Sequence, residues 1–236
     1  PPVTVHEESD AETIFRWEAT GAATAKVVGF KDPNQRIADV VIPDKIEGRF
    51  ITAIGDGAFA NSASGMTDLT LPLFCTEIGF RAFSGIPTLA RVAFASVRDW
   101  ANPAAPAALA IGRYAFAATG LASVRLPAEV ASLGDHAFAD CRKLAEMTVL
   151  GRPAVGRRPF RRAGIDAGTT PTVRLAPSLA DDADYLGSLT QDVGDVKVRT
   201  DAVVDGLSLG GLEAAPGAVR LSVAVNRAAA WGAVDA

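Results

Sequence analysis

A six-residue pattern, Ile-Gly-x-x-Ala-Phe, recurs along this 236-residue chain and constrains its fold more than any other feature. Five copies, the last two with substitutions, occupy Ile54–Phe59, Ile78–Phe83, Ile111–Phe116, Leu133–Phe138 and Val155–Phe160. Their phenylalanines follow one another at steps of 24, 33, 22 and 22 residues. Because so short a unit cannot bury its own apolar face, we expect the copies to stack as successive coils of a solenoid.

The one long step between copies indicates an inserted loop. The segment from Arg98 to Ala110 accounts for about ten extra residues, and it contains Pro103 and Pro106, which favour loops. We therefore expect the coils to continue on both sides of it, with Trp100 carried on the loop.

A second apolar pattern lies between the copies. An apolar residue is followed three and five positions later by two more, which predicts a short strand with a buried inner face. A proline, which cannot donate to a strand ladder, comes directly after several of these strands, at Pro43, Pro72, Pro127 and Pro177. The apolar sets are Met66, Leu69, Leu71; Leu89, Val92, Phe94; Leu121, Val124, Leu126; Leu144, Met147, Val149; and, in part, Val40, Ile42 and Val173, Leu175.

Stacking predicts how these residues meet. Equivalent strands pair in parallel at roughly 4.7 to 4.9 Å. The isoleucine and phenylalanine of each motif then lie over those of the next coil, as an aliphatic column beside an aromatic one. The motif glycine serves either a sharp turn or a close approach of two backbones, both of which a Cβ would hinder. We expect the Ala-Phe pair on a short helical or 3₁₀ turn.

The strand, the proline and the Ile-Gly-x-x-Ala-Phe motif together resemble the repeat of the BspA-type leucine-rich repeat family. The resemblance covers roughly Asp39 to Gly164, and Cys141 stands three residues after Phe138, where that family often has a cysteine. The first repeat departs by five extra residues within Asp44 to Ala53, and the last by Pro159 in place of alanine.

This resemblance implies a fold that is α/β to mainly β. The expected fold is a right-handed leucine-rich-repeat solenoid of about five to six short coils with parallel strands. The resemblance also implies a secreted or surface-anchored bacterial protein of the adhesin or host-interaction kind, with no catalytic residues to transfer.

Three regions are expected along the chain. Residues 1–38 form an N-terminal β cap, a hairpin of Thr13–Trp17 with Ala25–Phe30 in which Trp17 and Phe30 cover the first coil. Residues 39–187 form the solenoid, with the insertion at 98–110. Residues 188–236 form a C-terminal β segment, complete in itself or continued beyond the chain, with alternating stretches at Val196–Arg199, Leu207–Leu209 and Val219–Val225.

The charge and hydropathy of the chain limit the classes of partner that it is expected to bind. The formal net charge is -4 with both signs interspersed, so no whole-molecule field draws nucleic acid or an anionic membrane. No apolar run reaches the roughly 18 residues of a membrane span. The chain opens Pro1-Pro2-Val3 without an initiator methionine. We expect a signal peptide to have been removed and the protein to be extracellular or on the cell surface.

Residues for catalysis or metal binding are sparse. The two histidines are His6 and His136, and the two cysteines, Cys75 and Cys141, stand at different positions of different repeats. No metal-ligand spacing, nucleophile elbow, phosphate loop or dinucleotide fingerprint is present. We expect no catalytic residue, no metal and no cofactor, and we expect the cysteines to be free, buried thiols.

Two charged stretches each admit two interpretations. Arginines are dense around the last motif. One interpretation is an anionic partner, which would be a nucleic acid or a glycan, and the other is a solvated edge of the solenoid. The edge is preferred because aromatic residues between them are lacking apart from Phe160. Asp181, Asp182 and Asp184 lack the glycine and glutamate of a calcium loop and are read as a polar exit from the last coil. The arginines are Arg152, Arg157, Arg158, Arg161 and Arg162.

The outward positions of the predicted strands form the candidate binding surface, because in a solenoid they align across coils into one face. Trp100 is added because an aromatic residue on a protruding loop can anchor a ligand, although packing on the solenoid flank competes with that role. The surface comprises Asp68, Thr70, Arg91, Ala93, Ser123, Arg125, Glu146, Thr148, Thr172, Arg174 and Trp100.

The sequence thus favours a monomeric, non-catalytic interaction module that binds a protein or a glycan through this face, without nucleic acid and without membrane insertion by this segment. Two alternatives stay open. The repeats are a structural spacer that presents the C-terminal β segment, or the chain is the accessory region of a larger surface enzyme.

Overall fold

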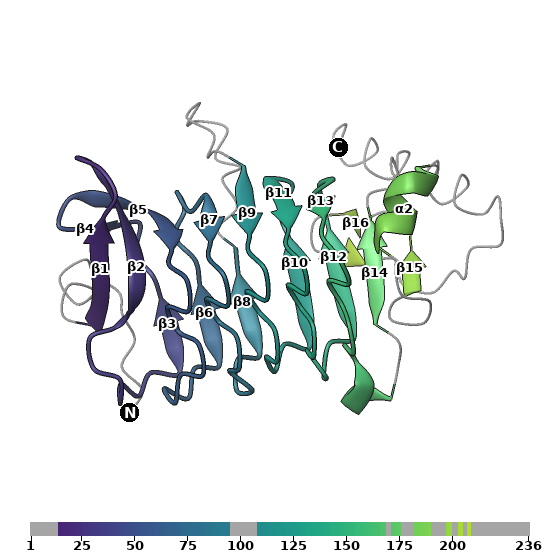
Figure 1. Cartoon of the computed structure of the whole chain (residues 1–236). Helices are drawn as coiled ribbons and strands as arrows, with labels where there is room; N and C mark the ends of the chain where they lie inside the picture. The colour runs from purple at the N-terminus through teal and green to yellow at the C-terminus, as the bar shows by residue number, and fades with distance from the viewer. Residues whose placement is uncertain are drawn as a thin grey trace, which may run out of the picture.

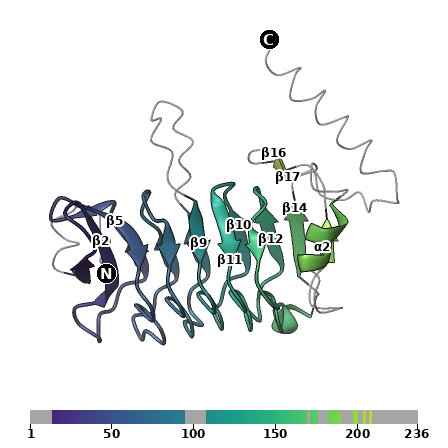
Figure 2. The same ribbon diagram turned by 45° about the horizontal axis from the view of Figure 1, so that its top comes forward.

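The protein forms a solenoid whose coils follow one another along a single axis (Figures 1 and 2). The structure is a computed structural model of the chain, and it describes residues 14–94, 108–168, 171–175, 182–189, 197–199, 203–204 and 207–208. The strands of each coil pair in parallel with those of the next, and strand predominates over helix. The predicted fold class is confirmed.

The strands predicted from the apolar sets line one side of the coil, which we call the first sheet, as a three-stranded and a four-stranded parallel ladder. Equivalent apolar residues pair in register, as Leu69 with Val92 and Val124 with Met147. Nearly all of these residues are fully buried. The strands form two groups: β3 (Asp39–Val41), β6 (Asp68–Thr70) and β8 (Arg91–Ala93); then β10 (Ser123–Leu126), β12 (Glu146–Val149), β14 (Thr172–Leu175) and β15 (Lys197–Arg199).

A second parallel sheet, which the sequence patterns did not predict, carries the aliphatic residue of each motif. Ile54 pairs with Ile78, Ile78 with Ile111, and Ile111 with Leu133. The expected aliphatic column is therefore present. The strands are β1 (Phe15–Ala19), β2 (Thr24–Phe30), β5 (Arg49–Ile54), β7 (Glu77–Ile78), β9 (Leu109–Ile111), β11 (Val130–Leu133) and β13 (Ala154–Val155), with β4 (Lys45–Ile46) paired to β5.

This sheet explains the departure of the first repeat and corrects the end of the inserted loop. The extra residues of the first repeat form a hairpin of β4 and β5, joined by Glu47 and Gly48 with φ of 48° and 72°. Such a pair of positive φ values suits a tight two-residue hairpin. The inserted loop was expected to reach Ala110, but Leu109 and Ala110 lie in β9, where Leu109 is only 7% exposed. Burial of Leu109 on the same face as Ile111 places it in the coil.

The motif phenylalanines form the predicted aromatic column. Phe59, Phe83, Phe116 and Phe138 are nearly parallel to their neighbours, with ring centroids 5.3, 5.3 and 5.4 Å apart along the series. Phe160 follows at 6.2 Å and 19°. This offset stacking suits the quadrupoles of the rings, and each ring also buries a large apolar area.

Close approach of backbones, and not backbone conformation, explains the motif glycines. None of these glycines has a positive φ. A Cβ on Gly112 would lie 2.5 Å from the carbonyl oxygen of Ile78 and 2.8 Å from the carbonyl carbon of Gly79. Similar contacts meet Gly79, Gly134 and Gly156. Of the two roles that the sequence allowed, the structure selects this one.

The rest of each motif forms a third side of the coil, which we call the turn face: residues 56–61, 80–85, 113–118, 135–140 and 157–162. Backbone N–H groups there alternate in direction. Ala58 donates within its own coil to Gly55, whereas Gly57 and Phe59 donate to Phe80 and Ala82 of the next coil. The same alternation recurs in the following coils.

The turn face is not helical, contrary to expectation, because two positions in every coil adopt a left-handed conformation. These are the fourth residue of the motif and the second residue after its phenylalanine. A positive φ breaks a helical run, and it turns the intervening N–H groups toward the next coil. The residues are Gly57, Asn61, Arg81, Gly85, Tyr114, Ala118, His136, Asp140, Arg158 and Arg162.

Both ends of the column are covered. The predicted hairpin is confirmed as antiparallel β1 and β2, and β2 adds to the second sheet in parallel with β5. Phe30 covers the first coil, 4.8 Å from Phe59. Trp17 is partly buried against the core. At the other end lies helix α2 (Ala183–Leu189), whose Tyr185 joins the core.

The C-terminal strands only partly match expectation. β15 pairs with β14 in parallel, so this strand extends the solenoid sheet and does not begin a separate module. Short β16 (Val203–Val204) and β17 (Leu207–Ser208) pair antiparallel. A 3₁₀ turn, η1 (Ile165–Ala167), follows the last motif. The stretch at 219–225 lies outside the described residues.

Truncation of the aromatic column tests the stacking. We expect Phe83→Ala or Phe138→Ala to lower the free energy of unfolding by about 3–5 kcal/mol, because each ring is fully buried between two others. Phe160→Ala should cost less, since its one stacked partner among the described rings is Phe138. Denaturant melts that rank Phe160→Ala as the most damaging would contradict the column.

The glycine contacts give a second test. Gly112→Ala should destabilise the protein by about 1–3 kcal/mol, because its Cβ meets backbone atoms that cannot move without separating two coils. Gly55→Ala is the matched control. There the nearest atom is a side-chain methyl of Val28 at 3.1 Å, which has room to adjust. Equal losses from both changes in thermal melts would refute the close-approach explanation.

Candidate functional site

The strands of the first sheet place the predicted surface residues in two rows, which we call the strand face. One row runs through Asp68 and Arg91, and the other through Thr70 and Ala93. After the inserted segment the rows resume, as Ser123, Glu146 and Thr172 in one and Arg125, Thr148 and Arg174 in the other. Trp100, the remaining candidate, lies outside the described residues.

Charged residues of the strand face bind one another. The guanidinium of Arg91 donates a hydrogen bond to Asp68 directly opposite. Arg174 Nε lies 2.8 Å from Glu146 Oε1 on the neighbouring strand. Acidic and basic side chains therefore pair across the coils, and the face is polar and mixed in charge.

Hydrogen bonding from Arg91 is the main cause that lowers the pKa of Asp68 below its usual range. Burial of the carboxyl group acts in the opposite direction, and the Thr67 hydroxyl, 2.8 Å from Asp68 Oδ2, supports the lowering. The carboxylate form of Asp68 is thus the form that the strand face stabilises.

One predicted surface residue is less accessible than expected. Thr148 is only 8% exposed, although it lies in an outward row. In register it stands between Arg125 and Arg174, whose side chains are much longer. Of its two neighbours in the row, Arg125 is exposed, whereas the Arg174 side chain is itself only 12% exposed.

The arginine-rich stretch pairs largely with acids of neighbouring coils. Arg157 Nε lies 3.6 Å from Asp135 Oδ2, and Arg162 Nη1 lies 3.3 Å from Asp140 Oδ1. Arg152 donates through Nε and Nη2 to Asp182, at 2.9 and 2.7 Å.

Asp182 has a structural role that the sequence reasoning missed. Its Oδ1 accepts the N–H of Tyr185 at 3.0 Å at the start of α2, where backbone donors lack partners. That bond, with the Arg152 pair, lowers the pKa of the Asp182 carboxyl.

Within the described ranges, no group of three His, Cys, Asp or Glu side chains is arranged to hold a metal ion.

Both cysteines are free and buried, as predicted. Cys141 Sγ lies 3.1 Å from the carbonyl oxygen of Phe116 and 3.2 Å from the Thr119 hydroxyl. Burial raises the pKa of Cys75 to about 12 and that of Cys141 to about 11. Thiols with such a pKa are almost fully protonated near neutral pH and are poor nucleophiles.

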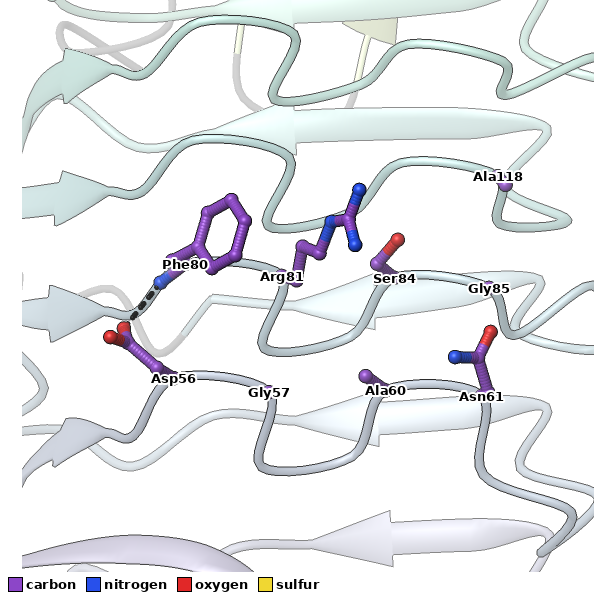
Figure 3. Close-up of a pocket in the computed structure, with 9 residues that line it drawn as sticks. All are labelled: Asp56, Gly57, Ala60, Asn61, Phe80, Arg81, Ser84, Gly85 and Ala118. Atoms are coloured by element: carbon purple, nitrogen blue, oxygen red, sulfur yellow. Dashed lines mark hydrogen bonds between the residues drawn. The ribbon is translucent and has the colours of Figure 1, made fainter.

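The turn face holds a depression that sequence reasoning missed. Its volume is about 510 Å³, and it spans the first three motif coils (Figure 3). Its lining includes four small residues whose side chains leave space for it, Gly57, Ala60, Gly85 and Ala118. Asp56, Asn61, Phe80, Arg81 and Ser84 complete the lining. The x-x pairs of the first two motifs, Asp56-Gly57 and Phe80-Arg81, belong to this lining, and this variable pair was the signal in the sequence.

Comparison with known proteins agrees with this architecture. The model of the family described as "BspA type Leucine rich repeat region" matches six copies, over residues 30–104 and 108–154. Among curated proteins, no sequence is detectably similar to this chain. No helix in the described parts of the chain has the length and apolarity to cross a bilayer.

Solved structures with similar folds are bacterial leucine-rich repeat proteins. The T. pallidum leucine-rich repeat protein TpLRR has a TM-score of 0.55 and 23% identity, with 70% of each chain covered. A leucine-rich repeat protein from Bacteroides capillosus has a TM-score of 0.45 and 20% identity, with 73% of this chain and 97% of the other covered. A leucine-rich cell surface protein from Faecalibacterium prausnitzii has a TM-score of 0.42 and 19% identity, over 73% and 55% of the two chains.

The Asp68–Arg91 pair predicts a pH dependence. Because the folded-state pKa of Asp68 is lowered, its contribution to stability is complete above the pKa of an unfolded aspartate and is lost as the pH falls through the folded-state value. Asp68→Asn and Arg91→Gln should each reduce the decline of the melting temperature with acid in that window. An unchanged acid dependence in both variants would contradict the pairing.

Proposed function

Because the chain belongs to the BspA-type leucine-rich repeat family, we propose that it is a non-catalytic interaction module that binds a protein or a glycan through the strand face. The observation that carries the proposal is the register of the strand face. Each coil adds two outward side chains, and parallel pairing aligns them in rows over β3, β6 and β8 and again over β10, β12 and β14.

The composition of the rows supports a recognition role. Arginine, which is enriched in protein interfaces, stands beside threonine, serine and carboxylates, and the ion pairs restrict how these side chains move. A partner that binds such a face orders few flexible groups, which lowers the conformational part of the entropy cost of association. A rigid array of this kind suits an extended ligand better than a small molecule.

We place the protein outside the cell, in secreted form or at the cell surface, and we regard it as a monomer. Family membership supports the location. The thiols are compatible with it, because Cys75 and Cys141 are buried and protonated and so resist oxidation. The hairpin of β1 and β2 and helix α2 cover the two ends of the stack, which would otherwise invite another copy.

Bulky substitutions on the strand face test the proposal. Ala93 and Ser123 are exposed, and tyrosine suits strands, so Ala93→Tyr with Ser123→Tyr should leave the fold intact while blocking the rows. Once a ligand is found in a screen of host matrix proteins and glycans, we expect this double variant to bind it at least about tenfold more weakly, since each ring obstructs a central contact.

Ala131→Tyr on β11 is the matched control, because it adds the same ring to an exposed position of the second sheet. It should bind like the unmodified protein. No ligand in the screen, or equal binding by the double variant, would overturn the proposal. Binding that depends instead on residues 188–236 would identify the repeats as a spacer.

A further inference from the structure

The turn face is basic although the chain as a whole is acidic. It carries six arginines and three aspartates, a local charge of +3 against -4 for the whole sequence. The aspartates are Asp56, Asp135 and Asp140, and the arginines are Arg81, Arg113, Arg157, Arg158, Arg161 and Arg162. This separation of charge favours an anionic partner on this face.

Two of these arginines are held by aromatic rings and not by acids. The Arg81 guanidinium lies 5.2 Å from the ring centre of Phe80 and 5.4 Å from that of Tyr114. Arg113 lies 5.1 Å from the Tyr114 ring, which also stacks on His136 at 4.8 Å. Neither Arg81 nor Arg113 has an ion-pair partner in the described chain. Stacking occupies the face of a guanidinium and leaves the N–H groups at its edge available for an anion.

Beside this stack lies the depression of Figure 3, which has the features of a sugar site. The Phe80 ring at its rim is 42% exposed, and such a ring attracts the C–H groups on the face of a sugar through its negative quadrupole. Ser84 and Asn61 line the same depression. Neither of their side chains makes a hydrogen bond within the described residues, so both have donors and acceptors left for hydroxyl groups.

Asp56 fixes the position of the ring. Its Oδ1 accepts the backbone N–H of Phe80 at 2.7 Å, which ties two coils together at the rim of the depression (Figure 3). The same contact recurs between Asp135 and the N–H of Arg157, also at 2.7 Å, and it lowers the pKa of Asp135. The rim is therefore built from a contact that the fold repeats.

We propose that the turn face binds an acidic polysaccharide, a chain of sugars that bear carboxylate or sulfate groups. A sugar ring lies against Phe80 in the depression, its hydroxyls bond to Asn61 and Ser84, and its acidic groups meet Arg81 and Arg113. This site is on a different side of the coil from the strand face and does not rest on the function proposed for that face.

The same observations disfavour nucleic acid. Single strands bind to several successive exposed rings, whereas Phe80 is the one ring of this stripe that is well exposed; Tyr114 and His136 are half-buried. A polysaccharide, which carries several hydroxyl groups as well as its acidic groups, fits the mixture of acid, amide, hydroxyl and guanidinium groups better.

Calorimetric titration with polygalacturonate, dextran sulfate, uncharged dextran and oligothymidylate tests the proposal on the full chain. At least one of the two acidic polysaccharides should bind, and the pair of probes distinguishes carboxylate from sulfate. Phe80→Ala should weaken that binding at least about fivefold by removing the ring beneath the sugar. Arg81→Gln with Arg113→Gln should weaken it at least about tenfold and reduce its dependence on salt.

Lys143→Gln is the matched control, because it removes one exposed positive charge outside the turn face and the strand face and should leave binding unchanged. Thermal melts establish that each variant is folded. Absence of binding to both acidic probes, equal binding of uncharged dextran, tighter binding of oligothymidylate, or unchanged binding by the folded turn-face variants would each overturn the proposal. The Ala93→Tyr with Ser123→Tyr variant should bind these probes normally, which separates the two sites.

Discussion

Backbone contact between successive coils governs this structure. On two sides of the coil the contact is a parallel strand ladder, and on the turn face it is a series of N–H groups that alternate between their own coil and the next. Because these bonds set one spacing for the whole coil, side chains have no freedom to push the coils apart. The motif glycine, whose missing Cβ would lie 2.5 Å from a neighbouring backbone atom at Gly112, follows from that spacing, and so does the parallel stacking of the phenyl rings.

Sequence reasoning succeeded where a feature repeats with side chains of one kind. The Phe column, the Ile column and the strands marked by Leu69, Val124 and Met147 were all predicted from recurring apolar residues. Sequence reasoning failed where the structure depends on backbone conformation and not on a repeated type of side chain. The second sheet has strands as short as Glu77–Ile78, too short to show alternation. The left-handed residues of the turn face include arginine, tyrosine and alanine, which carry none of the usual signals of a positive φ.

The same contrast holds for the candidate sites. The strand face was predicted because inward and outward residues alternate along each strand, and the structure places Asp68, Arg91, Glu146 and Arg174 in its rows. The turn face was not predicted, because the x-x pair of the motif varies from coil to coil and no single residue type marks it. Only when Phe80, Arg81 and Tyr114 are seen on adjacent coils do three unrelated side chains become one stacked group.

Hydrogen bonds between coils run along the long axis of the column, and the strands lie across it (Figure 1). A force that pulls the two chain ends apart therefore loads the short ladder of one terminal coil at a time, in the manner of a zipper, and does not shear many bonds together. Each coil that detaches releases a length of extended chain of more than twenty residues at about 3.3 Å per residue. Under tension, a chain with this arrangement lengthens in steps as single coils unfold, and the remaining coils stay folded.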